Sequence, residues 1–196
     1  DTEKITAEDK QRTQMIQENI KREASLQTSH SLEDFIRSLG LKLTITSAKK
    51  ETVSRIAQLT QRTNQFNSTT RRRSELEIEE LMQRTDTKIF TVSVRDRYGD
   101  YGLVGVLILE EKQDLIVVDT MLLSCRVLGR GVEYQIINKI GQYAQEKNKG
   151  KVLFLFSSTA KNKPVQSFID DINKQCTYVG KTKKGYIYLS NELFQI

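Results

Sequence analysis

The stretch Ser124-Cys-Arg-Val-Leu-Gly-Arg-Gly-Val-Glu-Tyr-Gln135 follows an apolar run and leads into a segment with helical periodicity. A loop that joins a strand to a helix directs several main-chain N–H groups outward at the positive end of the helix dipole. Gly129 and Gly131 let the main chain approach an anion closely, while Arg126 and Arg130 add positive charge. The stretch therefore predicts a phosphate-binding loop, although a Gly-x-Gly pair taken alone is equally compatible with a plain turn.

Composition limits the classes of protein to which the chain can belong. With 196 residues, 37% of them hydrophobic, it can bury one sizeable core, so we expect one domain with an appendage. The longest apolar runs, such as 152–156, have the length of a strand and fall short of the roughly 18 residues of a membrane span. Two distant cysteines without metal-ligand spacing, and no charged-then-apolar leader, favour a reducing compartment. We therefore expect a soluble, cytoplasmic protein with no membrane partner and no metal site.

The net charge is +6, and basic residues cluster at 71–73 and 181–184. Such basic clusters can bind nucleic acid, a phosphorylated small molecule or an acidic protein. The sequence has no alternation of aromatic and basic residues of the kind that single-strand binders use, so nucleic acid is not the expected partner. The lysines at 181–184 are typical of a solvated hairpin turn.

Two helices are expected in the first forty residues. Thr6 and Asp9 form a capping box before a helix with few apolar residues, and Ser31 begins a shorter helix that Gly40 ends. The first helix cannot bury much surface alone. We therefore interpret residues 1–40 as a helical connector that packs against a neighbour.

From residue 41 the periodicity predicts the element order β-α-α-β-β-β-α-β-α-β-β. A capping box at Ser74 and Glu77 starts the second of these helices, and Asn162 is expected to cap the last, with Pro164 in its first turn. The expected strands are 41–45, 88–95, 102–109, 115–124, 151–156, 177–180 and 186–190, and the expected helices are 53–66, one from 74, 132–144 and one from 162.

The loop then shows a resemblance. Arg126-Val-Leu-Gly129-Arg-Gly131 matches R-x-x-G-x-G, the pyrophosphate loop of the GNAT superfamily of N-acetyltransferases, and the element order of residues 41–196 is similar to that fold. The resemblance implies an α/β (α+β) domain with a central mixed, mostly antiparallel sheet and flanking helices. It also implies that strands four and five separate to admit a pantetheine arm. The residues that would cradle the diphosphate of coenzyme A are Arg126, Val127, Leu128, Gly129, Arg130 and Gly131.

The next helix departs from the superfamily pattern Asn-x-x-Ala-x-x-Phe-Tyr. Asn162, which the resemblance adds to the cofactor-binding residues, and Phe168 fit it, but Val165 replaces the alanine and Ile169 the tyrosine that serves as general acid. An isoleucine cannot donate a proton, so acetyl transfer to an amine by that route is not expected.

Longer motifs resemble the C-terminal half of FkbH-like proteins. They are the junction 31–42, Arg62-Thr-Asn-Gln-Phe-Asn67 with residues 69–72, Val94-Arg-Asp-Arg-Tyr-Gly-Asp-Tyr-Gly102, and residues 119–133. In that family a haloacid dehalogenase-like (HAD) phosphatase domain precedes this region. The whole protein is similar to enzymes that load a phosphorylated glyceryl unit onto an acyl carrier protein. The D-x-D-x-T/V motif of the phosphatase is not in this sequence, so its chemistry is not carried over. We expect residues 1–40 to be the tail of a missing HAD domain and 41–196 the GNAT-like acyltransferase domain.

Two side chains are candidates for catalysis. Cys125 lies before the glycine loop, where Arg126 and a helix N-terminus are expected to favour its thiolate as a nucleophile. Asp119, near the end of the same strand, is a candidate general base. The alternatives are a small buried cysteine and a buried partner for an arginine. Cys176 and His30 show no such surroundings.

The candidate substrate-binding residues are polar side chains in two regions. Amide and hydroxyl groups after a helix can bind glyceryl hydroxyls or phosphate, and loop hydrogen bonds explain them equally well. Two aspartates flank a tight turn, and the first explanation for them is that their side chains bond to the main chain of a hairpin turn. These residues are Asn64, Gln65, Asn67, Thr70 and Arg71, and then Asp96 and Asp100.

The sequence thus predicts an acyltransferase-type domain that binds a phosphopantetheine arm, of coenzyme A or of an acyl carrier protein, and takes part in glyceryl or related acyl transfer. The alternative is a non-catalytic module of the same fold that docks the carrier, with the chemistry in the HAD domain. Expected partners are a carrier protein or a coenzyme A thioester, and that HAD domain.

Overall fold

The computed structural model describes residues 7–176 and 178–194. The chain divides into two compact units. An N-terminal unit contains the chain up to Leu43 together with residues 94–102, and a larger sheet unit contains residues 44–93 and everything from Leu103 onward.

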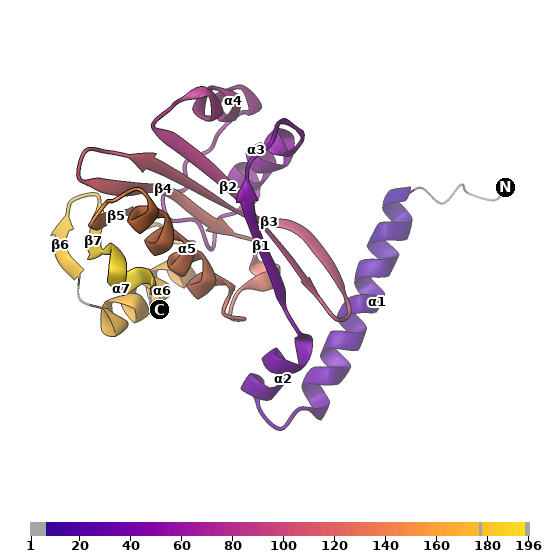
Figure 1. Cartoon of the computed structure of the whole chain (residues 1–196). Helices are drawn as coiled ribbons and strands as arrows, with labels where there is room; N and C mark the ends of the chain where they lie inside the picture. Colours follow the sequence, from indigo (N-terminus) through magenta and orange to yellow (C-terminus); the bar gives the residue numbers. More distant parts are fainter. Residues whose placement is uncertain (1–6, 177, 195–196) are drawn as a thin grey trace. The chain divides into compact units, whose positions relative to one another are not determined.

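The N-terminal unit contains the two expected helices, α1 (Ala7–Thr28) and α2 (Leu32–Leu39) (Figure 1). The Ser31 side chain accepts a hydrogen bond from the N–H of Asp34, and Gly40 ends α2 with a φ of 57°, which confirms both predicted boundaries. The capping residue proposed for α1, Thr6, lies outside the described residues. Ile16 and Ile20 are exposed on α1, so this helix leaves apolar surface uncovered.

A buried ion pair holds α1 to the other part of its unit. Arg22 donates from Nε and Nη2 to the two carboxylate oxygens of Asp96, at 2.7 and 3.0 Å. Asp96 also accepts from the Tyr101 hydroxyl at 2.8 Å and from the N–H groups of Tyr98 and Gly99. Burial alone would raise the pKa of this carboxyl, but the hydrogen bonds from Arg22, Tyr101 and the main chain outweigh it and lower the pKa.

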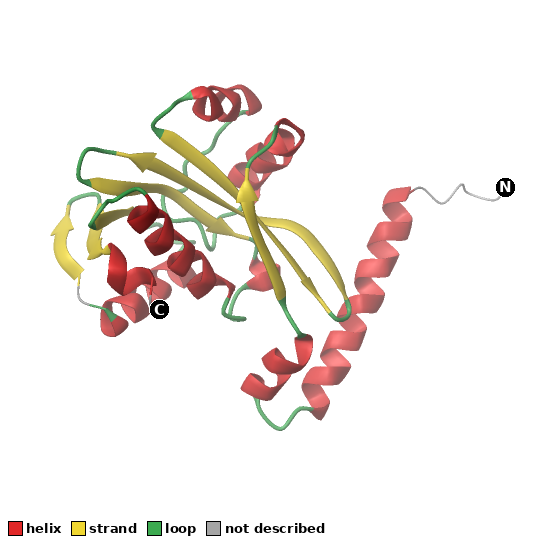
Figure 2. Ribbon diagram, viewed as in Figure 1, coloured by secondary structure: helices red, strands yellow, loops and turns green. Residues whose placement is uncertain are grey.

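A seven-stranded sheet with the order β1-β2-β3-β4-β5-β7-β6 forms the framework of the protein (Figure 2). β3 pairs with β4, β5 with β7 and β6 with β7 in antiparallel fashion, whereas β4 and β5 are parallel. The predicted mixed, mostly antiparallel sheet is confirmed. The strands are β1 (Lys42–Ser47), β2 (Thr87–Asp96), β3 (Gly99–Glu111), β4 (Leu115–Leu123), β5 (Lys151–Leu155), β6 (Tyr178–Thr182) and β7 (Gly185–Leu189).

Helices cover both faces of the sheet because neighbouring strand residues point to opposite sides. Ile89 of β2 packs in a buried cluster with α3 and α4, while the next residue, Phe90, meets Tyr143 of α5 at a ring distance of 5.5 Å. The helices of this unit are α3 (Val53–Arg62), α4 (Glu75–Gln83), α5 (Val132–Glu146), α6 (Lys163–Gln175) and α7 (Ser190–Phe194), with short 3-10 turns η1 (Lys50–Thr52) and η2 (Cys125–Val127).

The element order predicted from residue 41 is confirmed, with differences at boundaries. α3 ends at Arg62 rather than at 66, because its last turn is followed by a segment that bonds to β4 instead. β3 begins at Gly99, so the expected turn is shorter. Asn162 occupies the cap position of α6, but its side chain makes no capping bond. The helix α7 was not predicted, and Thr177 lies outside the described residues.

Gly185 and Gly180 provide a matched test of the sheet near the C-terminus. A Cβ at Gly185 would overlap the carbonyl oxygen of Phe154 on β5, whereas one at Gly180 would meet only Ile187 Cδ1 at 3.7 Å. Gly185→Ala should therefore lower the free energy of unfolding by about 1–3 kcal/mol or more, and Gly180→Ala should change it far less. Urea denaturation of both variants checks this, and equal stability of the two would contradict the described strand register.

Asp96→Asn tests the anchor of α1. Because the pKa of Asp96 is lowered by folding, its stabilising contribution is full above the ordinary pKa of about 3.9 and is lost as the pH falls through the folded value. Amide hydrogen exchange of α1 should be faster in Asp96→Asn than in the wild type at neutral pH. That difference should shrink below about pH 4. A difference that does not depend on pH would show that Asp96 acts through packing and not through its charge.

Candidate functional site

The strongest candidate site is a pocket beside the thiol of Cys125. It has a volume of about 430 Å³ and receives residues from α3, from the loop that follows α3 and from the end of β4. Cys125 is exposed in η2, directly after β4, so the alternative of a buried cysteine is excluded. The residues of this Cys125 pocket are Arg55, Leu59, Arg62, Thr63, Asn64, Gln65, Phe66, Leu123, Ser124 and Cys125.

The Cys125 pocket is positively charged. Arg55 and Arg62 contribute guanidinium groups, and none of the lining residues is acidic. The pKa of Arg55 is lowered, first by burial and then by the charges of Arg126 and Arg62. Arg55 itself donates to the carbonyl oxygen of Leu103 at 3.3 and 3.4 Å. An anion that binds near Arg55 offsets the repulsion between these positive charges, so this pocket favours a negatively charged ligand.

The glycine loop has the predicted backbone conformation, but several of its N–H groups form hydrogen bonds within the protein. Gly129 and Gly131 have φ values of 72° and 80°, a conformation that glycine adopts without strain. The N–H of Gly129 donates to Glu133 Oε1 at 2.6 Å, and those of Val127 and Leu128 donate to carbonyl oxygens of the same turn. The expectation that these amides point outward is therefore wrong at Val127, Leu128 and Gly129, because a local turn and a carboxylate four residues later satisfy them.

Glu133 is itself unusual. Glu133 is only 6% exposed, and its Oε2 atom is buried without a hydrogen-bond partner among the described residues. It also borders a second pocket, of about 310 Å³, between the glycine loop and α6. We call this the loop pocket. Its lining residues are Phe66, Leu128, Gly129, Gly131, Glu133, Tyr134, Pro164, Ser167, Phe168 and Asp171.

Strands β4 and β5 separate as the resemblance implies. Their pairing ends at Val118 and Phe154, while β4 continues to Leu123. The space beyond is filled by residues 66–69 of the same chain, and Asn67 forms an antiparallel bridge with Leu122. The segment 66–69 is buried throughout. Its main-chain bonds are Leu123 N–H to Phe66 O at 3.0 Å, Ser68 N–H to Met121 O at 3.0 Å, and Ser157 N–H to Ser68 O at 2.8 Å.

Asn162 supports this inserted segment. Its side-chain amide donates to the carbonyl oxygens of Asn67 and Ser157, at 3.3 and 2.8 Å, and its oxygen accepts from the N–H of Thr159 at 2.8 Å. Asn162 is 1% exposed. Its hydrogen bonds are thus made within the protein, although we expected them to serve a cofactor.

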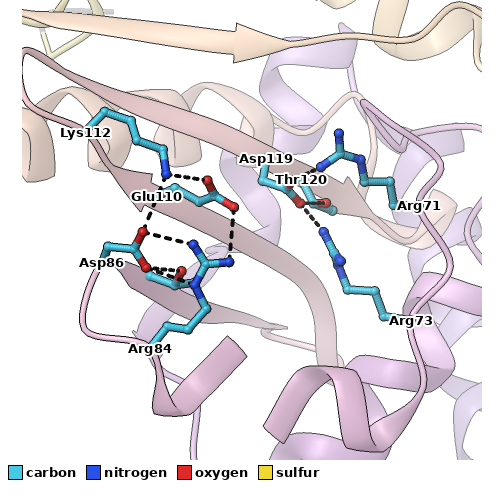
Figure 3. Close-up of polar contacts among 9 residues, drawn as sticks. Arg71, Arg73, Arg84, Asp86, Glu110, Lys112, Asp119 and Thr120 are labelled. Carbon is cyan, nitrogen blue, oxygen red and sulfur yellow. Dashed lines mark hydrogen bonds and ion pairs between the residues drawn. The ribbon is translucent and has the colours of Figure 1, made fainter. Parts of the chain in front are cut away.

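Asp119 is a buried ion-pair partner. Arg71 and Arg73 both donate to its carboxylate, as Figure 3 shows, and the Thr120 hydroxyl adds a bond at 2.8 Å. Its side chain is 2% exposed and borders neither of the two pockets. The structure therefore agrees with the alternative noted for Asp119, a buried partner for an arginine, and the role of a general base stays a prediction.

The other predicted side chains are divided between two places. Asn64 and Gln65 line the Cys125 pocket, although Asn64 also accepts a hydrogen bond from Arg72. Asn67 lies in the inserted segment, and its side-chain oxygen accepts from the N–H of Thr70, which has a positive φ of 52°. Such a φ is strained for a β-branched residue.

The two predicted aspartates of the hairpin belong to the N-terminal unit. Asp96 binds Arg22, and Asp100 accepts from the N–H of Gly102 at 2.7 Å, so both serve local structure.

Three residues of the site were missed from the sequence. Arg55 and Arg62 are seven residues apart on α3, a spacing that places both on one face of a helix and could have indicated them. Glu133 at the second position of α5 reads as an ordinary favourable charge at a helix start, and no sequence signal shows that it folds back onto Gly129.

Two classes of feature are not found among residues 7–176 and 178–194. These residues contain no group of three or more His, Cys, Asp or Glu side chains able to hold a metal ion. In the same part of the chain, no helix combines the length and apolarity needed to cross a bilayer.

The structure is similar to solved N-acetyltransferases. A spermidine N-acetyltransferase from Vibrio cholerae in complex with CoA and spermine is 16% identical, with a TM-score of 0.56, over 77% of this chain and 97% of that one. The ribosomal-protein-S18-alanine N-acetyltransferase from Escherichia coli is 12% identical, with a TM-score of 0.52, over 76% and 90%. In sequence, no family model and no curated protein matches. The protein therefore has the α+β fold of the GNAT N-acetyltransferases.

Proposed function

We propose that this protein is a GNAT-fold acyltransferase in which Cys125 accepts an acyl group and passes it to the thiol of a phosphopantetheine arm. The observation that carries this proposal is the Cys125 pocket, where an exposed thiol lies beside two arginines and no carboxylate. A thiol in such surroundings is the group that a covalent acyl-transfer step needs.

The transfer consists of two balanced exchanges. The Cys125 thiolate attacks the acyl carbonyl, a thioester C–S bond forms, and the donor leaves as phosphate or as a thiolate. The thiolate of the arm then attacks the same carbonyl and releases Cys125. Arg55 and Arg62 are placed to bind negative charge on the donor, and charge-assisted hydrogen bonds of this kind are strong. Ile169, 1% exposed in α6, has no proton to give, so the proposed transfer does not use a general acid at this position.

The motifs of the FkbH-like resemblance support a finer proposal. Arg62, Asn64 and Gln65, from the motif that begins at Arg62, line the Cys125 pocket, and Cys125 belongs to the motif around the glycine loop. We therefore propose a phosphorylated glyceryl or related acyl unit as substrate, an acyl carrier protein or coenzyme A as the arm's bearer, and a HAD domain as a partner.

A non-catalytic docking module is the second candidate. The engaged N–H of Gly129 and the apolar Ile169 favour it, because both remove groups on which acetyl transfer in this fold is expected to depend. The two candidates differ in whether Cys125 forms a thioester.

Acylation of Cys125 tests the proposal directly. Incubation with an acyl phosphate, such as acetyl phosphate, should add the acyl mass to the peptide that contains Cys125, and Cys125→Ala should abolish this addition. Cys176 is the internal control, because burial raises the pKa of its thiol to about 11 and keeps it protonated. Peptide mass spectrometry makes the measurement. If Cys125 stays unmodified, or if both cysteines react equally, the docking module is the better description.

Substitution of Arg62 tests the role of the charge in the pocket. Arg62→Ala should slow acylation by an acyl phosphate about ten- to a hundredfold, since a hydrogen bond to a charged group contributes roughly 1.5–3 kcal/mol. Arg62→Lys should retain most of the rate because it keeps the charge. Arg84→Ala, which removes a surface arginine paired with Asp86, is the matched control and should leave the rate unchanged. Equal rates in all four proteins would exclude Arg62 from the site.

A further inference from the structure

The space that a pantetheine arm would use between β4 and β5 is closed by the chain itself. Residues 66–69 bond to β4 on one side and to Ser157 on the other, and each of these residues is at least nine-tenths buried. Removing the segment would leave main-chain groups of Met121, Leu123 and Ser157 without partners. Because several hydrogen bonds and the buried Phe66 ring would be lost together, the segment is a fixed part of the sheet.

Three N–H groups of the glycine loop, those of Val127, Leu128 and Gly129, are likewise already bonded within the protein. The Gly129 N–H is bonded to a carboxylate, so a diphosphate approaching the loop would meet the negative charge of Glu133 in a buried position. Like charges at short range in a buried site repel strongly. Cys125 is not among the residues that line the loop pocket. Phe66 lines both pockets and packs its ring against Phe168 at 5.4 Å, so this side chain lies between the loop pocket and the pocket of the thiol.

One open approach to the thiol remains among the described pockets. The Cys125 pocket is larger than the loop pocket, contains the thiol, and has at its rim the exposed side chains of Arg62 and Gln65. Its arginines can receive a phosphate, and its apolar members, Leu59, Phe66 and Leu123, can contact an uncharged arm. The binding elements of an arm that ends in a thiol are therefore all present here.

We propose that the phosphopantetheine arm reaches Cys125 through the Cys125 pocket, along α3 and the loop after it, and not through the cleft between β4, β5 and the glycine loop. This inference rests on the proposed function, and it assigns a new binding site for the arm. A nucleotide attached to the arm then gains nothing from the glycine loop.

Disulfide exchange with pantethine, the disulfide of pantetheine, tests the route without any acyl donor. The Cys125 thiolate attacks one sulfur, a mixed disulfide forms, and the second pantetheine leaves as a thiolate. Gln65→Trp places an indole ring at the rim of the Cys125 pocket, and Ser167→Trp places one in the loop pocket. Both positions are exposed, so both variants should fold. The rate at which pantethine labels Cys125, divided by the rate for the small disulfide of 2-mercaptoethanol, is measured by mass spectrometry.

The proposed route predicts that Gln65→Trp lowers this ratio about tenfold or more, since small displacements of a reacting group have effects of that size, while Ser167→Trp leaves it unchanged. The opposite pattern would overturn the route but leave Cys125 as the acceptor. The disulfide of coenzyme A should label the wild type no faster than pantethine at high salt, where charge steering is screened. If the disulfide of coenzyme A labels the wild type faster than pantethine does, and Ser167→Trp abolishes this difference, the proposed route is also overturned. If only the small disulfide reacts, both the route and the proposed function fail.

Discussion

The candidate site of this protein depends on main-chain hydrogen bonding at the place where β4 and β5 separate. Parallel strands that diverge leave unpaired N–H and C=O groups, and buried groups of this kind must be satisfied. Here residues 66–69 satisfy them, with Asn67 opposite Leu122 and Ser68 bonded to both Met121 and Ser157. This insertion ends α3 early, places Phe66 between two pockets and brings Asn64 and Gln65 beside Cys125.

The arrangement of charge follows from the same insertion. Just beyond the inserted segment, Arg71 and Arg73 both form ion pairs with the buried carboxylate of Asp119 (Figure 3). Arg55 and Arg62, on the helix before that segment, line a pocket that has no carboxylate among its residues. Because burial makes an unpaired charge costly, the buried carboxylate of Asp119 needs Arg71 and Arg73 as its two partners. The clustered arginines at 71–73, which attract attention in the sequence, are largely structural for this reason.

Much of the fold could be predicted from local sequence patterns. The order of elements from β1 to β7, the capping box of α4 at Ser74 and Glu77, and the glycine ends of α2 and the loop before α5 all depend on neighbours a few residues apart. The position of Cys125 at a strand end was predicted in the same way. The site was predicted only in part, because α3 carries Arg55 and Arg62 to the thiol through contacts between residues about sixty apart in the chain.

The sequence by itself determined the order of strands and helices, the strand-to-helix corner with its two left-handed glycines, and the presence of a thiol beside it. These features follow from periodicity, from backbone preferences of glycine and from capping, all of which act over a few residues. Only the tertiary structure decided whether that corner is open. Glu133 folds back onto Gly129, and the buried residues 66–69 fill the gap beside β4. The main-chain amides at both places bond to acceptors that tertiary packing brings near, and the local sequence does not specify those acceptors.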